Sequence, residues 1–249
     1  MNRPLCRHLA YLGAPRKLSE LLYTPPHSLC HQAYQPKDMR RGGTINADGF
    51  GVGWYTGDTT VRYRRHTPIW NDADLPGIAD GVGTTAMLAA VRSATVGMPV
   101  SDGACAPFTD GRWLFSLNGS IKGWPDSVAE LARKLPVTTV MSMDAPTDAA
   151  FLWILLRERL RDNDPAEAVR GVTAELVAAA PGSRLNLLLT DGSRAVATTW
   201  WHALSVHRDS RGVTLASEPL DEGPAWRAVD DRKLVTATAS DFEISDLNV

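Results

Sequence analysis

The order of local patterns along the sequence predicts an α+β domain in which helices cover antiparallel sheets. Strand-like segments separated by glycine and proline occupy the first half of the chain, helical patterns follow, and strand-like segments return near the end. The 249 residues are 44% hydrophobic and 22% charged, an ordinary composition for a globular protein with a sizeable core. Because no internal repeat, low-complexity tract or long polar linker divides the chain, we expect one domain over residues 6–249.

The first two thirds of the chain predict five strands followed by three helices. The strands are short runs bounded by turn-forming residues, at 7–12, 51–55, 61–65, 87–93 and 113–117. The helices are expected at residues 127–134, 147–161 and 164–180. In the second helix, apolar residues recur at helical spacing, at Ala150, Phe151, Ile154 and Leu155. The third helix begins with Asp164-Pro-Ala-Glu167, which supplies an N-cap, a proline at the first helical position and a capping-box glutamate.

The last quarter of the chain returns to strand patterns. Strands are predicted at residues 185–190, 195–205, 213–217 and 234–239. The segment Asp191-Gly-Ser193 between the first two is typical of a hairpin turn, so we expect these two strands to pair with each other.

Charge balance and hydropathy argue against several classes of function. The chain has 26 basic and 28 acidic side chains, a formal net charge of −2, whereas nucleic acids and anionic membranes select a basic surface. The longest strictly apolar run, residues 149–156, is far shorter than the roughly 20 residues needed to span a bilayer. The N-terminus has no apolar stretch of signal-peptide length, so we expect a cytoplasmic protein with neither nucleic acid nor membrane as a partner.

The three cysteines, Cys6, Cys30 and Cys105, are too few and too scattered for a disulfide framework, so each is considered as a reduced thiol. An unpaired cysteine that opens a strand is commonly a small buried hydrophobe. The functional alternative is that Cys6 becomes the first residue of the mature chain. Its α-amine, with a pKa of about 7.7 to 8.0, is then a general base beside a thiol whose pKa is about 8.5. Such a pair needs no histidine partner.

Three further positions could serve either structure or catalysis. Asn118-Gly119 after a strand is most often a turn, but the Asn118 amide and the Gly119 N–H could also form an oxyanion hole. Arg92, inside an apolar strand, could pair with a core carboxylate or bind the carboxylate of a substrate. Asp148, at a helix start, could complement the helix dipole or receive the ammonium group of a ligand.

Together these elements resemble the class II glutamine amidotransferase domains of the N-terminal-nucleophile hydrolase superfamily, and most of all the γ-glutamyl hydrolase family of ergothioneine biosynthesis. The stretches that carry the resemblance are Cys6-Arg-His-Leu-Ala-Tyr-Leu-Gly13, Pro25-Pro-His-Ser-Leu29, Asn46-Ala-Asp-Gly-Phe-Gly-Val-Gly-Trp54, Val91-Arg-Ser-Ala-Thr95 and Ser142-Met-Asp-Ala-Pro-Thr-Asp148. It runs from residue 6 to about residue 160, and more loosely through Ala216-Ser-Glu-Pro-Leu220. The resemblance implies a four-layer αββα sandwich.

Carried over to the matching positions, the resemblance makes Cys6 the nucleophile and its freed amine the base. Arg92 would bind the α-carboxylate of a γ-glutamyl group, and Asp148 its α-ammonium. Asn118 and Gly119 would hold the oxyanion. These charges suit a γ-glutamyl head, which is a zwitterion and needs one cation and one anion at fixed separation. No cofactor and no metal is implied.

The implied reaction is hydrolysis of γ-glutamyl-hercynylcysteine sulfoxide to hercynylcysteine sulfoxide and glutamate through a thioester. Stand-alone hydrolysis is expected, because an amidotransferase that uses ammonia needs a synthase domain for which this chain has no room. The alternatives are a hydrolase of glutathione-type peptides, a glutaminase subunit of an amidotransferase, and an inactive γ-glutamyl binding module. The expected partner is the small-molecule substrate, and the sequence indicates no particular oligomeric state.

Two features depart from the family pattern. Many relatives have His immediately before the residue that matches Asn118, where this chain has Leu117, a change that leaves both oxyanion donors in place. Five residues precede Cys6, and a blocked amine cannot act as the base. Because removal of Met1 alone does not expose Cys6, residues 1–5 are expected to be absent from the active chain. Either a short propeptide is cleaved or, as we favour, translation begins at position 5, where a Leu codon such as TTG can initiate with methionine.

Other motifs have structural explanations that we favour. The glycines of residues 48–53 superficially resemble a nucleotide loop, but no strand-loop-helix unit surrounds them, so they are expected to allow close backbone packing. His27, Cys30 and His31 are possible metal ligands, yet structural zinc takes four ligands and no second ligand pair exists. Most of the eight tryptophans are expected in the core, and one or two could hold a trimethylammonium group. Those in the half that carries the motifs are Trp54, Trp70, Trp113 and Trp124.

Overall fold

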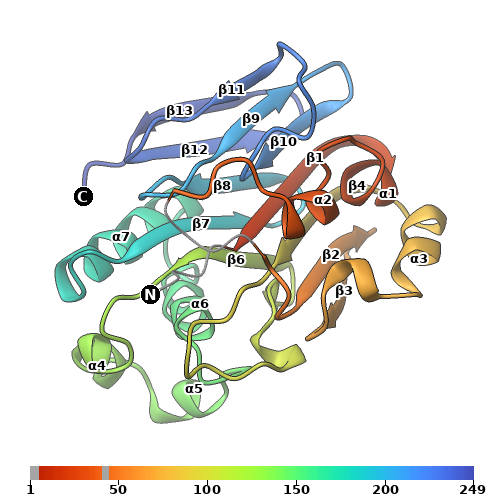
Figure 1. The fold of residues 1–249 in the computed structure, drawn as a ribbon. Coiled ribbons are helices and arrows are strands. Elements are labelled where there is room, and N and C mark those ends of the chain that lie inside the picture. The colour runs from red at the N-terminus through yellow and green to blue at the C-terminus, as the bar shows by residue number, and fades with distance from the viewer. Residues whose placement is uncertain (1–5, 41–44) are drawn as a thin grey trace.

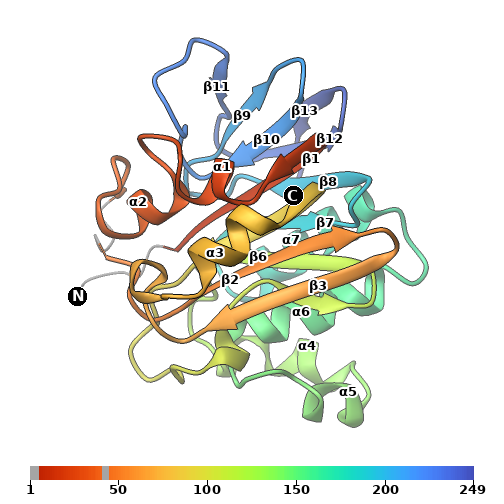
Figure 2. The ribbon, with the colours of Figure 1, turned by 90° about the vertical axis from the view of Figure 1, so that its right-hand side faces the viewer.

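The computed structural model describes residues 6–40 and 45–249, and these residues form four stacked layers (Figure 1). Two antiparallel sheets pack face to face, and helices lie on the outer face of each sheet (Figure 2). The αββα sandwich expected from the sequence is therefore confirmed. No helix within the described ranges is long and apolar enough to cross a membrane.

The first sheet has seven strands in the order β11-β9-β10-β1-β4-β2-β3, with β1 at its centre. β1 pairs with β10 on one side and with β4 on the other, so that Leu9 lies opposite both Ala216 and Ala89. Three short helices, α1 to α3, cover the outer face of this sheet. The elements are β1 (Arg7–Lys17), β2 (Phe50–Thr56), β3 (Thr59–Arg65), β4 (Gly83–Val91), β9 (Ser205–Arg208), β10 (Gly212–Ala216), β11 (Trp226–Ala228), α1 (Ser19–Leu22), α2 (Leu29–Tyr34) and α3 (Leu75–Gly81).

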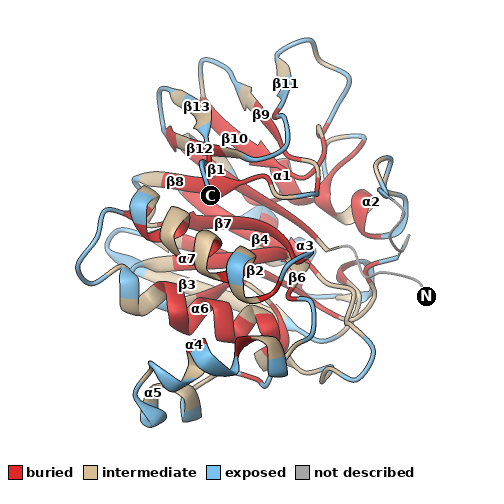
Figure 3. Ribbon diagram, turned by 90° about the vertical axis from the view of Figure 1, so that its left-hand side faces the viewer, coloured by how far each residue is buried: buried red, intermediate tan, exposed pale blue. Residues whose placement is uncertain are grey.

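The second sheet has six strands in the order β13-β12-β8-β7-β6-β5. Helices α6 and α7 cover its outer face, and α4 and α5, which are more exposed, extend beyond one end of the layer (Figure 3). The elements are β5 (Phe108–Asp110), β6 (Trp113–Ser120), β7 (Arg184–Thr190), β8 (Arg194–Thr198), β12 (Lys233–Thr238), β13 (Phe242–Asp246), α4 (Ala129–Arg133), α5 (Val137–Met141), α6 (Asp148–Arg159) and α7 (Pro165–Ala179).

Three hydrophobic clusters fill the three interfaces between the four layers. Side chains of β1 alternate between two of them, as the pleat of a strand requires. Leu9 and Tyr11 belong to the cluster beneath α1 to α3, whereas Ala10 and Leu12 belong to the cluster between the sheets. The start of β1 is consequently buried on both faces.

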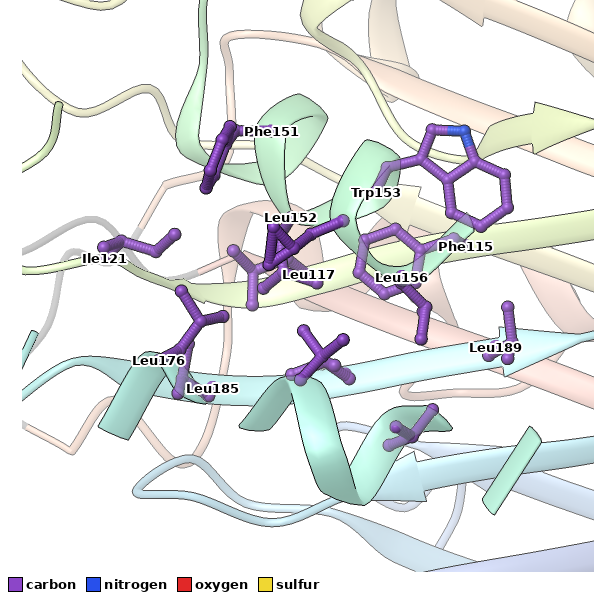
Figure 4. Close-up of a cluster of buried hydrophobic side chains, with 14 of the residues drawn as sticks. Phe115, Leu117, Ile121, Phe151, Leu152, Trp153, Leu156, Leu176, Leu185 and Leu189 are labelled. Atoms are coloured by element: carbon purple, nitrogen blue, oxygen red, sulfur yellow. The ribbon is translucent and has the colours of Figure 1, made fainter. Parts of the chain in front are cut away.

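The third cluster lies between α6, α7 and the six-stranded sheet. Figure 4 shows Phe151, Leu152 and Leu156 of α6 above strands β6 and β7. Phe115 of β6 stacks on Trp153, with ring centres 5.6 Å apart. Because most residues of α6 are buried, the N-terminus of this helix cannot shift without opening a close-packed core.

Signals at helix and turn boundaries agree with the sequence analysis. The side chain of Thr147 caps α6, and that of Asp164 caps α7, whose first residue is Pro165. Asp191 Oδ1 accepts backbone hydrogen bonds that close the β7–β8 hairpin, and Gly192 adopts a φ of +87° there. The predicted hairpin turn is therefore confirmed.

The strand predicted at residues 195–205 is wrong. The structure has two strands there, β8 in the six-stranded sheet and β9 in the seven-stranded sheet. Between them the chain leaves one sheet for the other, and Thr199 marks the departure by donating its hydroxyl to the Asp230 carbonyl at 2.6 Å. The run of strand-forming residues continues across this crossing, so the local pattern carried no sign of it.

Candidate active site

A pocket opens where the two sheets meet, at the starts of β1 and α6 and the ends of β4 and β6. Four of the five predicted site residues line it: Cys6, Arg92, Gly119 and Asp148. The fold thus brings together residues from four places: directly before β1 (Cys6), directly after β4 (Arg92), in β6 (Gly119) and at the start of α6 (Asp148).

The thiol of Cys6 lies at the edge of the seven-stranded sheet, directly before β1. Its Sγ–H donates to the Ser93 carbonyl, with 3.8 Å between sulfur and oxygen. Burial raises the pKa of Cys6, and a hydrogen bond from the Ser93 backbone to the thiolate and the positive charge of Arg92 only partly offset this effect. A neutral thiol of this kind needs a base before it can attack a carbonyl.

Arg92 follows the last residue of β4, and its backbone is fixed on both sides. Its N–H donates to the Gly49 carbonyl at 2.7 Å, and its carbonyl accepts from the Asp48 N–H at 3.0 Å. Within the described residues, the half-buried guanidinium makes no ion pair with an acidic side chain. It is therefore a cation available to an anionic group in the pocket.

Asp148 is the first residue of α6 and is almost fully buried. Its Oδ2 accepts from the Ile121 N–H at 2.9 Å, and its Oδ1 accepts from the Ala149 N–H at 2.8 Å. Burial raises the pKa of Asp148, opposed by these two hydrogen bonds and by the charge of Arg92. The carboxylate has a structural role, since it ties the chain after β6 to the helix. Each oxygen still has a lone pair for a ligand cation.

Gly119 lines the pocket, whereas the neighbouring Asn118 is buried between the sheets. The Asn118 Nδ2 donates to the Ser217 hydroxyl at 3.3 Å, which uses one of its two amide hydrogens. A side chain at position 119 cannot be accommodated, because a Cβ there would lie 2.0 Å from the Arg184 carbonyl oxygen. The chain therefore requires glycine where its backbone meets the pocket.

Comparison with known proteins places this geometry in a family. A family model described as class-II glutamine amidotransferases matches residues 24–212. The γ-glutamyl-hercynylcysteine sulfoxide hydrolase of Mycolicibacterium smegmatis is 40% identical over 232 residues, which cover 93% of this chain and 95% of the relative. The protein of that name from Mycobacterium tuberculosis is 38% identical over 244 residues, covering 98% of this chain and 97% of the relative.

The chain belongs to the class II glutamine amidotransferase family. A solved structure described as a glutamine aminotransferase class-II domain protein, from Silicibacter pomeroyi, shares the fold, with a TM-score of 0.70. The two chains are 23% identical, and the match covers 97% of this chain and 99% of the other. The amidotransferase match to residues 24–212 includes Arg92, Asn118, Gly119 and Asp148 and begins after Cys6.

No sequence pattern pointed to the buried charged group that contacts Cys6, the predicted nucleophile. Arg7 is 2% exposed, and its Nη1 donates to the Cys6 carbonyl at 3.1 Å. Its Nε donates to Glu218 Oε1 at 2.9 Å, and Glu218 itself is 3% exposed. The only sequence signal was the resemblance at residues 216–220, which named no role for the acid.

Glu218 is the centre of this buried network. Besides Arg7, it accepts from the backbone N–H of Lys37 at 2.8 Å and of Asp38 at 3.1 Å, and it contacts His27 Nε2 at 2.6 Å. Burial raises the pKa of Glu218, but the His27 hydrogen bond, the Arg7 charge and the two N–H groups outweigh burial and lower it to about 2. His27, considered in the sequence as a possible metal ligand, is used here in a hydrogen bond.

The structure agrees with some of the expectations for the remaining motifs and disagrees with others. The glycines of residues 48–53 do allow close packing: a Cβ at Gly51 would lie 2.2 Å from the Ala106 carbonyl oxygen. Leu117, where many relatives have His, packs into the core cluster beneath α6. Among the tryptophans, expected mostly in the core, Trp70 is an exception, since it is 41% exposed beside Tyr34.

Proposed function

We propose that this amidotransferase-family chain is a γ-glutamyl amidohydrolase that converts γ-glutamyl-hercynylcysteine sulfoxide to hercynylcysteine sulfoxide and glutamate. The observation that carries the proposal is the convergence of Cys6, Arg92 and Asp148 on one pocket. The near-full-length similarity to two hydrolases named for this substrate supports the choice of leaving group.

The γ-glutamyl head binds through its two charges. Arg92 pairs with the α-carboxylate, and Asp148, already oriented by two N–H groups, accepts from the α-ammonium. Arg92 follows β4 of the seven-stranded sheet and Asp148 begins α6, which packs on the six-stranded sheet, so a zwitterion spanning them is held at both ends. This leaves the γ-carbonyl facing Cys6.

The base in our proposal is the α-amine of Cys6, set free when residues 1–5 are absent. No histidine belongs to the described lining of the pocket, which supports a base supplied by the nucleophile's own backbone. The thiol proton passes to this amine as the sulfur attacks the γ-carbonyl carbon. A C–S bond forms, and the carbonyl oxygen becomes an oxyanion.

The oxyanion accepts from the Gly119 N–H and from the remaining amide hydrogen of Asn118. As the intermediate collapses, the ammonium of Cys6 returns a proton to the leaving nitrogen and the C–N bond breaks. The γ-glutamyl group is then a thioester of Cys6. A water molecule, deprotonated by the same amine, attacks the thioester, the C–S bond breaks, and glutamate leaves with the thiol restored.

The substrate is tested by measuring kcat/KM for γ-glutamyl-hercynylcysteine sulfoxide, glutathione and glutamine under one condition. We expect the sulfoxide to have the highest value, because binding energy from its larger leaving group can orient the scissile amide. Equal or better turnover of glutathione would favour a peptide hydrolase instead. Glutamine hydrolysis that needs a partner protein would favour a glutaminase subunit. Binding of these compounds without turnover would favour an inactive binding module.

The identity of the base is tested at the N-terminus. Intact-mass measurement or N-terminal sequencing of fully active protein should find Cys6 first. Active protein that retained residues 1–5 would contradict the α-amine mechanism.

A further inference from the structure

A second, larger groove adjoins the active-site pocket. The two cavities share Thr95, Met98 and Asp148, so they lie side by side. A γ-glutamyl head held at Arg92 and Asp148 therefore has this open space beside it. The groove is the space available to the leaving group that is attached to the γ-carbonyl.

The groove offers a cation close to the scissile bond. Lys122 is exposed in the lining, next to Ile121, whose N–H is held by Asp148 at 2.9 Å. The Lys122 N–H donates to the Ser183 hydroxyl at 3.0 Å, so the backbone on both sides of this loop is fixed. In the part of the chain that the structure describes, the Lys122 ammonium forms no ion pair. Asp148 is the acidic residue in the described lining, and the substrate's α-ammonium already engages it.

The groove also offers two aromatic faces. Trp124 is half-buried and packs against Phe151 of the core, with ring centres 5.3 Å apart. Trp201 is 47% exposed and adopts a φ of +92°, a left-handed conformation that favours glycine. Its backbone is held there, because its N–H donates to Asp231 Oδ1 at 2.7 Å and its carbonyl accepts from Arg40 Nη1 at 2.6 Å.

An exposed tryptophan in a strained conformation at the rim of a groove points to a ligand that contacts its ring. From these observations, and resting on the function proposed above, we infer that the groove binds the leaving amine of the substrate. The carboxylate of that amine pairs with Lys122, and its flat or quaternary ammonium portion lies against Trp124 and Trp201. An aromatic face attracts such cations, and a lysine ammonium attracts the carboxylate.

The test measures kcat/KM of two variants, Trp201→Gly and Lys122→Ala, on the sulfoxide, glutathione and glutamine. Trp201→Gly removes the ring and relieves the backbone strain, so we expect the melting temperature to stay the same or rise. Its kcat/KM for the sulfoxide should fall roughly 3- to 30-fold, the range of a lost cation–π contact. Lys122→Ala should lower the values for the sulfoxide and glutathione by about 3- to 10-fold, and less at high salt. Glutamine, whose leaving group is ammonia, should be unaffected within about twofold.

Matched controls are Trp70→Ala, another exposed tryptophan, and Lys134→Ala, another exposed lysine, neither of which lines the groove. Both should leave all three substrates unchanged. Losses that are equal for glutamine and the larger substrates would overturn the inference, as would no loss at all.

The two proposals fail in different ways. If the wild-type protein does not cleave the sulfoxide, the proposed substrate is wrong. The effect of Lys122→Ala on glutathione relative to glutamine still decides whether this groove binds a carboxylate-bearing leaving group.

Discussion

On the side of the seven-stranded sheet, Cys6, the proposed nucleophile, is held by buried charges, whereas on the side of the six-stranded sheet Asp148 is held by apolar packing and backbone hydrogen bonds. Cys6 depends on Arg7, which in turn depends on Glu218. Asp148 depends on α6, whose neighbours are almost all apolar, and on two backbone N–H groups. One pocket therefore has two walls of different physical character.

Because of this difference, one wall of the pocket is sensitive to loss of charge and the other to changes in side-chain volume. A buried ion pair tolerates little loss of charge, because removing one partner leaves the other unpaired in a medium that solvates it poorly. A packed helix tolerates changes of charge in other parts of the molecule. It does not tolerate changes in the volume of its own buried side chains. A substitution or a change of pH can therefore perturb one wall of the pocket while sparing the other.

The largest effect is expected at the nucleophile. Cys6→Ala should lower kcat by on the order of 10⁵- to 10⁶-fold, the loss typical of a deleted nucleophile, while the fold remains intact. Cys30→Ala is the matched control and should retain activity. Labelling by a diazo-oxo-norleucine glutamine analogue, followed by peptide mapping, should find Cys6 modified. Modification at Cys30 or Cys105 would move the nucleophile.

The next largest effect is expected at Asn118, the proposed oxyanion donor. Asn118→Ala should lower kcat by roughly 10²- to 10³-fold, because the transition state loses a hydrogen bond. Ser217→Ala removes the partner of Asn118 without removing the amide and should cost much less activity. An Asn118→Ala variant that changed only KM, or a Ser217→Ala variant as damaged as Asn118→Ala, would show that Asn118 has no direct part in the chemistry.

Acid should weaken the charged wall selectively. The pKa of Glu218 is about 2 in the folded protein against an ordinary value of 4.5, so the folded state favours the carboxylate. This stabilisation, about 3 kcal/mol, is complete above about pH 5 and is lost as the pH falls toward 2. Urea unfolding at several pH values should therefore show Glu218→Gln less stable at neutral pH and closer to wild type near pH 2. Glu243→Gln, at an exposed site, is the control, and equal pH dependence in both variants would rule out this role.

The smallest effects compare one binding group from each wall. Arg92→Ala should raise KM by an amount equivalent to about 1.5 to 3 kcal/mol, with kcat changed less. Asp148→Asn, which keeps a side-chain oxygen for the N–H of Ile121, should do the same, and Asp148→Ala should also lower stability. Michaelis–Menten parameters for each variant provide the measurement. Unchanged substrate affinity in Arg92→Ala would remove it from the binding site.

Much of the fold could be predicted because its signals are local. The side chains of Thr147, Asp164 and Asp191 each bond to a backbone N–H within three residues, and such motifs are legible in sequence. The four-layer arrangement and the gathering of Cys6 and Arg92 came from the resemblance. The structure bears out that these two residues share a pocket, and their roles remain predictions.

The rest depended on contacts between distant residues. Glu218 meets Arg7 across almost the whole chain, and neither residue's neighbours in sequence show that both charges are buried. The passage of the chain from β8 in one sheet to β9 in the other cannot be recognised from the local sequence either, since strand-forming residues continue through it. Burial of single tryptophans depends on the final surface, so the exposure of Trp70 and Trp201 could not be read in advance.

The central position of β1 has a consequence for the order of events during synthesis. Its neighbour β10 is made long after β1, because Leu9 pairs with Ala216. Pairings of such high contact order form late and slowly. β1, which directly follows Cys6, therefore stays unpaired on this side until residues 212–216 have been made.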